Sequence, residues 1–317
     1  GYRSGSYPYP WVLDPGPGWY VDEVMVETGP LPVVTFPDSF ENGWTGWRVD
    51  YIGGQVTDFG IWEIGSPTSG PGSAHHGTNC AATVLNGNYP DDRSARLFSA
   101  PFVVPSADQL PRLRFWHWYS IAGHDFCEMQ IKAGTNSWQP LHRYTSTGSG
   151  VWNRQGFDLS PYSGQTVQLG FYSEFHGYQS GSYPYPWVLD PGPGWYVDEV
   201  ALVTGPLQTL TLNVAEVFEP GWRDWYAEDG TWEIGVPTYG PPTNSLGLRA
   251  HSGTNCAGTV LGSNYADDTY GRLVSPPFFV PEVGAHPTLR FWHWFSIAGH
   301  DFCEIQIKAA KGDWQPL

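Results

Sequence analysis

The sequence predicts an all-β protein built from tandem jelly-roll or β-sandwich domains. Two long segments of the 317-residue chain recur at the same offset of 176 residues. Residues 177–209 repeat residues 1–33 with 27 identities in 33, and residues 287–317 repeat residues 111–141 with 24 identities in 31. A period of this length matches one ordinary globular domain and is too long for a solenoid repeat. The 39 Gly and 29 Pro residues suit a fold with many turns between short strands.

The repeat divides the chain into three parts. Residues 1–33 correspond to the C-terminal part of a preceding repeat, residues 34–209 to a complete repeat, and residues 210–317 to the N-terminal part of a following repeat. We therefore expect the sequence to be a window on a longer array. An incomplete sandwich exposes sheet edges, so we also expect residues 1–33 of one copy to complete residues 210–317 of another copy by strand donation.

Alternating side chains predict the strands of the complete repeat. The segment 112–119 places two sets of side chains on opposite faces, namely Leu113, Phe115, His117 and Tyr119 against Arg112, Arg114, Trp116 and Trp118. The segment 126–132 alternates as well, with polar residues on one face, and 166–172 and 195–203 are further predicted strands. No stretch has the pattern of an amphipathic helix, so these short strands indicate a two-sheet sandwich.

Composition excludes several classes of partner. The formal net charge is −16 and only 15 residues are Lys or Arg, which argues against nucleic acid and against anionic lipid, because both bind basic patches. No run of about 18 apolar residues exists, so no membrane span is expected. The aromatic content of 16%, with 17 Trp, adds to the indication of an extracellular or cell-surface β protein.

The four cysteines fall two to a repeat at the same spacing. This pattern predicts the disulfides Cys80–Cys127 and Cys256–Cys303. The alternative is a pair of buried free thiols in each repeat.

The segment 180–194 carries four prolines just before the last predicted strand. Proline does not donate to a strand ladder, so the segment is expected to be a stiff excursion. It would display aromatic rings to a glycan or a neighbouring domain. The rings are Tyr183, Tyr185 and Trp187, with the counterparts Tyr7, Tyr9 and Trp11. The alternative is a lid that covers one end of the core.

An ordered set of short motifs runs through residues 34–209: Phe40 to Trp44, Trp62 to Pro67, His76 to Cys80, Leu97 to Pro101, and Gly194 to Val200. The set resembles the MAM-like jelly-roll modules of bacterial secreted proteins, which are attached to immune-inhibitor-type metalloproteases and to cell-surface proteins. The sequence lacks the four-cysteine pattern of animal MAM domains and adds the proline-rich excursion. The resemblance implies a fold and an extracellular setting, but no reaction.

The resemblance also implies a Ca²⁺ site, because in such jelly rolls an acid near the first strand meets an acid on the last strand. The corresponding residues are Glu41 and Asp198, with Asp125 as a third ligand, Glu219 and Asp301 in the following repeat, and Asp22 in the preceding one. Calcium favours several oxygen ligands of this kind. The alternative is that these acids face water or pair with arginines. A second candidate site follows a turn and comprises Asp91 and Asp92, or Asp267 and Asp268.

Catalytic motifs are not found. The histidines near the cysteines, His75, His76, His117 and His124, do not have the spacing of a zinc motif. The sequence contains no nucleophile elbow, HExxH motif or P-loop. Adjacent Asp198 and Glu199 would point to opposite faces of a strand, which does not suit a glycosidase pair. We therefore predict no enzyme.

The predicted function is that of a non-catalytic, extracellular tandem-repeat structural or adhesive protein. It would be a subunit or segment of a surface fibre or filament that contacts other copies of itself. The alternative is an array of carbohydrate-binding modules appended to a secreted enzyme.

Overall fold

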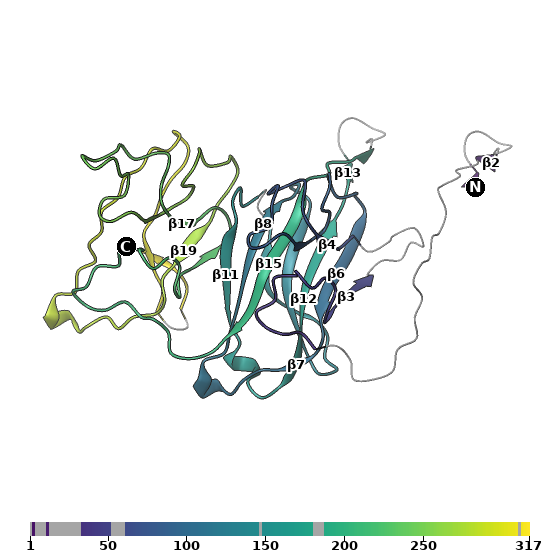
Figure 1. Cartoon of the computed structure of the whole chain (residues 1–317), viewed down its shortest axis with the longest axis horizontal. Coiled ribbons are helices and arrows are strands. Elements are labelled where there is room, and N and C mark those ends of the chain that lie inside the picture. Colours follow the sequence, from purple (N-terminus) through teal and green to yellow (C-terminus); the bar gives the residue numbers. More distant parts are fainter. Residues whose placement is uncertain are drawn as a thin grey trace. The chain divides into compact units, whose positions relative to one another are not determined.

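The computed structural model describes residues 2–3, 11–12, 33–51, 61–145, 148–179, 187–309 and 312–317. The chain divides into two units, Gly1–Leu31 and Pro32–Leu317. In the first unit, β1 (Tyr2–Arg3) pairs with β2 (Trp11–Val12) in an antiparallel hairpin. The second unit contains the sandwich (Figure 1).

Two antiparallel sheets form the sandwich. Sheet I has the strand order β10-β9-β12-β6-β3, and β7 also pairs with β12. Its strands are β3 (Trp47–Tyr51), β6 (Arg93–Ser99), β7 (Phe102–Val103), β9 (Phe126–Ala133), β10 (Gln139–Tyr144) and β12 (Thr166–Phe175). Sheet II has the order β11-β8-β15-β5-β4. Its strands are β4 (Glu63–Gly65), β5 (Cys80–Ala82), β8 (Arg112–Ser120), β11 (Asn153–Asp158) and β15 (Gly194–Val203). The chain crosses between the sheets repeatedly, which confirms the predicted all-β jelly-roll sandwich.

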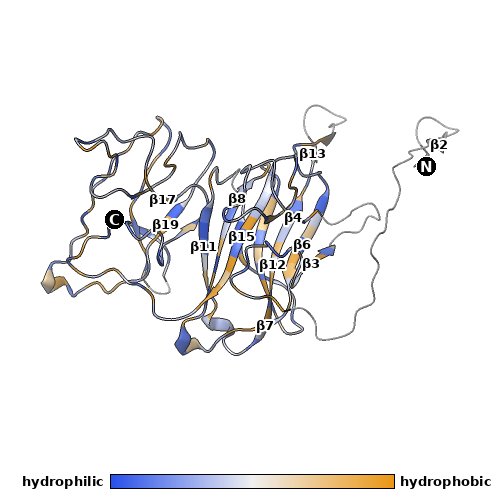
Figure 2. Ribbon diagram, in the orientation of Figure 1, coloured by the Kyte–Doolittle hydropathy of each residue, from blue (hydrophilic) through white to orange (hydrophobic). Residues whose placement is uncertain are grey.

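The core lies between the two sheets and is aromatic. The ring of Phe171 on β12 is 5.8 Å from Trp47, 5.2 Å from Phe115 and 5.4 Å from Trp195, measured between centroids. Figure 2 colours β11 as hydrophilic and shows hydrophobic stretches on β12 and β15. The predicted faces of residues 112–119 are confirmed, since Leu113, Phe115, His117 and Tyr119 are all fully buried.

The complete repeat also contains several short elements. A two-residue pair, β13 (Tyr178–Gln179) with β14 (Trp187–Val188), stands at the two ends of the proline-rich segment. Two 3-10 turns are η1 (Ala107–Gln109) and η2 (Ser160–Tyr162). In the part of the chain that the structure describes, no helix is long and apolar enough to cross a membrane.

Residues 210–317 contain only short strand pairs. These are β16 (Tyr226–Glu228) with β19 (Arg272–Val274), β17 (Glu233–Gly235) with β18 (Cys256–Gly258), and β20 (Gln306–Ile307) with β21 (Gln315–Pro316), and the 3-10 turn is η3 (Val283–Ala285). Residues 288–296 repeat the sequence of β8 but form no strand. Their rings are exposed, Trp292 by 78% and Phe295 by 63%.

Candidate binding surface

The predicted calcium ligands Glu41 and Asp198 both fix the turn at residues 76–79. The Glu41 carboxylate accepts hydrogen bonds from the backbone N–H groups of Asn79 (2.7 Å) and Thr78 (2.8 Å) and from the Thr78 hydroxyl (2.9 Å). These bonds, that of Asn79 above all, hold the pKa of Glu41 below its usual value. Asp198 is fully buried and accepts from the backbone N–H groups of His76 (2.9 Å) and Glu199 (2.7 Å). Burial raises the pKa of Asp198 to about 6.

Asp125 does not join them. Its carboxylate accepts hydrogen bonds from the Tyr89 hydroxyl (2.5 Å) and the His176 backbone N–H (2.6 Å). In the following repeat, Glu219 fixes the equivalent turn, and Asp301 accepts from the Tyr265 hydroxyl. No group of three or more His, Cys, Asp or Glu residues able to hold a metal ion occurs among the described residues. Calcium binding stays a prediction, and Asp22 lies outside the described residues.

The disulfide prediction is wrong. All four cysteines are free thiols. Cys80 on β5 packs with Ala82 and Tyr196 on the outer side of sheet II, whereas Cys127 on β9 belongs to the core between the sheets. Equal spacing in two repeats shows that the positions correspond, but it does not place the two side chains on facing surfaces. Burial raises the pKa of both thiols, which keeps them protonated. In the following repeat, Cys256 is half-buried and Cys303 is exposed.

The histidines are engaged in packing. His75 stacks on the ring of Trp116, with centroids 3.7 Å apart, and pairs with Glu199. His117 is fully buried, and its Nδ1 accepts a hydrogen bond from the Trp195 indole N–H at 3.2 Å. Burial lowers the pKa of His117 to about 3, so it is neutral at physiological pH. This arrangement confirms the interpretation of His117 as a hydrogen-bonded core residue.

The outer face of sheet I carries an aromatic and charged cluster that we name the Trp138 face. It comprises Arg96, Glu128, Gln130, Lys132, Trp138 and Tyr172, with Asp50 and Arg143 on the two edge strands. The Arg96 guanidinium lies 4.6 Å from the ring centroid of Trp138 and 5.2 Å from that of Tyr172. The Lys132 ammonium lies 5.8 Å from the Trp138 ring. Cations over aromatic rings stabilise this arrangement by roughly 0.5–2 kcal/mol each.

Hydrogen bonds fix the polar members of the Trp138 face. Arg96 Nε donates to the Gln130 side-chain oxygen (2.8 Å), and Gln130 donates in turn to Glu128 (2.5 Å). Arg143 donates to the other Glu128 oxygen at 2.7 Å, and Arg96 pairs with Asp50 at 3.2 Å. Arg96, Glu128 and Gln130 are each less than 9% exposed. The Arg96 charge is therefore neutralised within the repeat.

Gly170 makes room for the Trp138 ring. It lies on β12 at the centre of sheet I, between Phe98 of β6 and Gln130 of β9. A Cβ atom at residue 170 would lie 2.8 Å from both Cδ of Arg96 and Cζ3 of Trp138. Contacts this short do not occur between unstrained atoms, so the ring position requires glycine.

The following repeat reproduces the cluster. Arg272 lies 4.7 Å from the ring of Trp314, and the Lys308 ammonium lies 5.7 Å from it. Arg272 Nε donates to Gln306 at 2.8 Å, and Gln306 donates to Glu304. Glu228 takes the place of Asp50 as the carboxylate partner of the arginine. The cluster therefore forms from the same residue types even where the surrounding sheet is not assembled.

Sequence reasoning assigned no role to these residues. It placed the polar side chains of 126–132 on one face, which the structure confirms, but Trp138 and Trp314 stood out only as part of a repeated Trp-Gln-Pro-Leu segment. The positions of the predicted glycan-binding residues cannot be compared with those of Trp138 and Trp314. Tyr7, Tyr9, Tyr183 and Tyr185, and the side chains of Trp11 and Trp187, lie outside the described residues.

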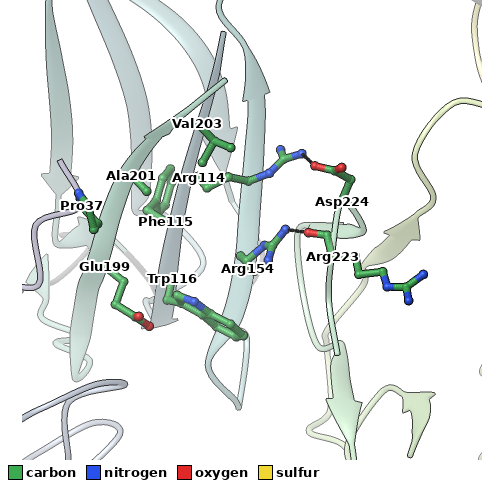
Figure 3. A pocket seen from close by; sticks show the side chains of 10 residues that line it. All are labelled: Pro37, Arg114, Phe115, Trp116, Arg154, Glu199, Ala201, Val203, Arg223 and Asp224. Atoms are coloured by element: carbon green, nitrogen blue, oxygen red, sulfur yellow. Dashed lines mark hydrogen bonds and ion pairs between the residues drawn. The ribbon is translucent and has the colours of Figure 1, made fainter. Parts of the chain in front are cut away.

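A second feature is a cavity of 250 Å³ beside sheet II. Figure 3 shows Arg114 of β8 reaching toward Asp224, and Arg154 of β11 reaching toward the backbone carbonyl of Arg223. Trp116 and Glu199 line the other side of this cavity. It lies where the complete repeat meets the first residues of the following repeat, and we refer to it as the junction cavity.

Comparisons with known proteins give remote similarities. No protein-family model matches the chain. Bacillopeptidase F of Bacillus subtilis (strain 168) is 26% identical over 201 residues, which cover 61% of this chain and 12% of that protein's length. The TmCBM61 structure in complex with β-1,4-galactotriose is 15% identical and covers 55% of this chain and 99% of that one, with a TM-score of 0.35.

A second solved structure is the K3 cleaved adhesin domain of Lys-gingipain from Porphyromonas gingivalis. It is 17% identical and covers 52% of this chain and 97% of that one, with a TM-score of 0.35. At these levels of similarity, any function of the chain has to follow from its own residues. The resemblance to MAM-like modules stays a prediction.

Proposed function

We propose that the chain is a non-catalytic, extracellular β-sandwich repeat that binds carbohydrate through the Trp138 face. The observation that carries this proposal is the recurrence of one cluster, an arginine and a lysine around a tryptophan, at Trp138 and again at Trp314. An aromatic ring packs against the apolar C–H face of a sugar, while neighbouring polar side chains bond to its hydroxyls. A pair of such clusters in one chain would raise the affinity for a polymer through multivalency.

The charge balance of the Trp138 face favours an uncharged saccharide. Arg96 is compensated by Asp50 within the same face, and Arg143 by Glu128. The face also presents exposed polar groups that can bond to hydroxyls, since Asp50 is half exposed and the Arg143 side chain is 53% exposed. Because both arginines already have a carboxylate partner, neither offers a free guanidinium fork to an anion.

The test is binding of the whole chain to a panel of neutral polysaccharides, by pull-down and by calorimetry. Trp138→Ala together with Trp314→Ala should lower the affinity at least about tenfold, because a stacked ring contributes on the order of 1–3 kcal/mol. Trp44→Ala is the matched control, since Trp44 is 44% exposed but does not belong to the face. Unchanged binding by the double variant would overturn the proposal, as would failure of the unmodified chain to bind any member of the panel.

A structural array is the second candidate, and the contact between repeats favours it. Trp222 packs edge-on against Trp116 with centroids 5.5 Å apart, and Asn153 donates a 2.6 Å hydrogen bond to the Gly230 carbonyl. Successive repeats are thus joined through a packed surface. Regular filaments in electron micrographs, formed by a chain that binds no glycan, would favour the array. Most of residues 1–33 lie outside the described residues, so strand donation by this segment stays a prediction.

A further inference from the structure

The junction cavity is surrounded by more arginines than carboxylates. Asp224 is the carboxylate within 4 Å of Arg112 (3.4 Å) and of Arg114 (3.6 Å). Arg154 has no carboxylate within that distance among the described residues. It donates to the Arg223 backbone carbonyl, and its buried Nε has no hydrogen-bond partner there.

The other charged groups around the cavity do not restore the balance. Glu199 lines the wall but is paired with His75, and Arg223 pairs with Glu216 at 3.8 Å. Burial, and then the neighbouring Arg114, lower the pKa of Arg154 to about 10, so it remains a cation at neutral pH. A partly buried cation with no carboxylate in ion-pair contact is unfavourable, and a bound anion would relieve this cost.

The rest of the cavity wall is apolar. Pro37, Ala201 and Val203 line it together with the indole of Trp116. Its 250 Å³ leaves room for one monosaccharide. A ligand that suits this cavity therefore combines one acidic group with a compact ring that has apolar C–H faces.

We propose that the junction cavity binds a hexuronate, a sugar acid whose carboxylate is held by Arg154 and Arg114. The guanidinium group presents its N–H donors in a fork that matches the two oxygens of a carboxylate. The Glu199 carboxylate and the Arg223 carbonyl accept hydrogen bonds from the ring hydroxyls. Because Asp224 and Arg223 come from the following repeat, the site exists only where two repeats are docked. It is separate from the Trp138 face and does not depend on the function proposed there.

The experiment titrates the whole chain at low ionic strength and follows tryptophan fluorescence and heat. The ligands are D-galacturonate and D-glucuronate, with D-galactose, D-glucose and acetate as matched comparisons. We expect a hexuronate to bind at least about tenfold more tightly than its neutral sugar and than acetate, and salt to weaken it. Equal binding of a hexuronate and its neutral sugar overturns the role of the arginines. Equal binding of acetate overturns the role of the sugar ring.

Variants locate the site. Arg154→Gln should reduce hexuronate affinity at least about tenfold, and Arg143→Gln, which changes an arginine on the Trp138 face, should leave it unchanged. Ala201→Leu fills the cavity without altering a charge, and should block binding even if Arg154→Gln disturbs folding. Trp138→Ala with Trp314→Ala should bind hexuronate normally, so loss at one site is distinguishable from loss at the other. Full hexuronate binding by Ala201→Leu contradicts the proposal.

Discussion

The two outer faces of the sandwich both carry arginines, but the carboxylates that pair with these arginines come from different repeats. On sheet I, Arg96 finds its carboxylate partner Asp50 on a neighbouring strand of the same repeat. On sheet II, Arg112 and Arg114 share Asp224, which belongs to the following repeat. Arg96 is therefore paired within its own repeat, whereas Arg112 and Arg114 are paired only when the following repeat is docked. The origin of the counter-charge decides whether such a face is a binding surface or a docking surface.

The repeats differ at the residue that makes this docking possible. By sequence, Asp224 corresponds to Gly46 of the complete repeat. Gly46 has a φ of +77°, and a Cβ atom there would lie 2.9 Å from the Cα of Val34. An aspartate does not fit in that position. The complete repeat therefore has no carboxylate equivalent to Asp224 with which to dock on sheet II of the preceding repeat. Junctions between otherwise similar repeats are therefore not interchangeable.

Removing the carboxylate partner of the arginines on each face should give the largest difference in stability between the two faces. Asp224→Asn leaves two arginines without a carboxylate, both less than 9% exposed, and should lower the free energy of unfolding by about 3–5 kcal/mol. Asp50→Asn removes a carboxylate that is 50% exposed and should cost less than about 1 kcal/mol. Urea unfolding of the two variants measures both values. Equal losses would show that the two faces do not differ in this way.

Acid should act mainly through sheet II, where two buried groups respond in opposite directions. His117 has a folded pKa of about 3, below its usual 6.5, so the stability it contributes is lost as the pH falls below 6.5. Asp198 has a folded pKa of about 6, above its usual 3.8, so its contribution increases as the pH falls from 6 to 4. Between pH 4 and 6 the two effects oppose each other.

Two variants should separate the pH dependence of stability that comes from His117 from that which comes from Asp198. Asp198→Asn leaves the His117 effect alone, so the free energy of unfolding should fall toward acid by up to about 1.4 kcal/mol per pH unit. His117→Gln leaves the Asp198 effect, so stability should rise as the pH falls through the same range. Urea unfolding at several pH values between 4 and 7 checks both signs. Identical slopes for the two variants would contradict the assignment of acid sensitivity to these residues.

The open face is tested by a substitution that moves a ring without touching the core. Gly170→Ala should displace Trp138 and Arg96 and lower polysaccharide affinity about tenfold, because the ring then no longer lies against β12. The free energy of unfolding should change by less than about 1 kcal/mol. Gly123→Ala is the control, since nothing lies within 4 Å of a Cβ atom at that residue. Normal binding by Gly170→Ala would show that polysaccharide recognition does not depend on the position of the Trp138 ring.

The sequence predicts those features that depend on local pattern. The faces of 112–119 follow from alternation, because β8 is paired on both sides and one of its faces is buried in the core. The disulfides and the Trp138 face depend on which strands become neighbours. Spacing does not reveal that Cys80 and Cys127 lie on different sides of sheet II, nor that Gly170 of β12 lies under Trp138, 32 residues earlier in the chain.

The smallest expected effect concerns Glu41. The sequence predicts it as a calcium ligand, and the structure shows it accepting hydrogen bonds from residues 78 and 79. As a calcium ligand it would stabilise the fold only with the metal present, whereas its hydrogen bonds to residues 78 and 79 act without it. We expect Glu41→Gln to lower Tm by a few degrees in EDTA, because an amide has only one acceptor oxygen. Thermal melts of the chain and of Glu219→Gln in EDTA and in CaCl₂ measure this. A calcium-dependent rise in Tm that Glu41→Gln abolishes would support the predicted metal site, since a ligand that binds only the folded state must stabilise it.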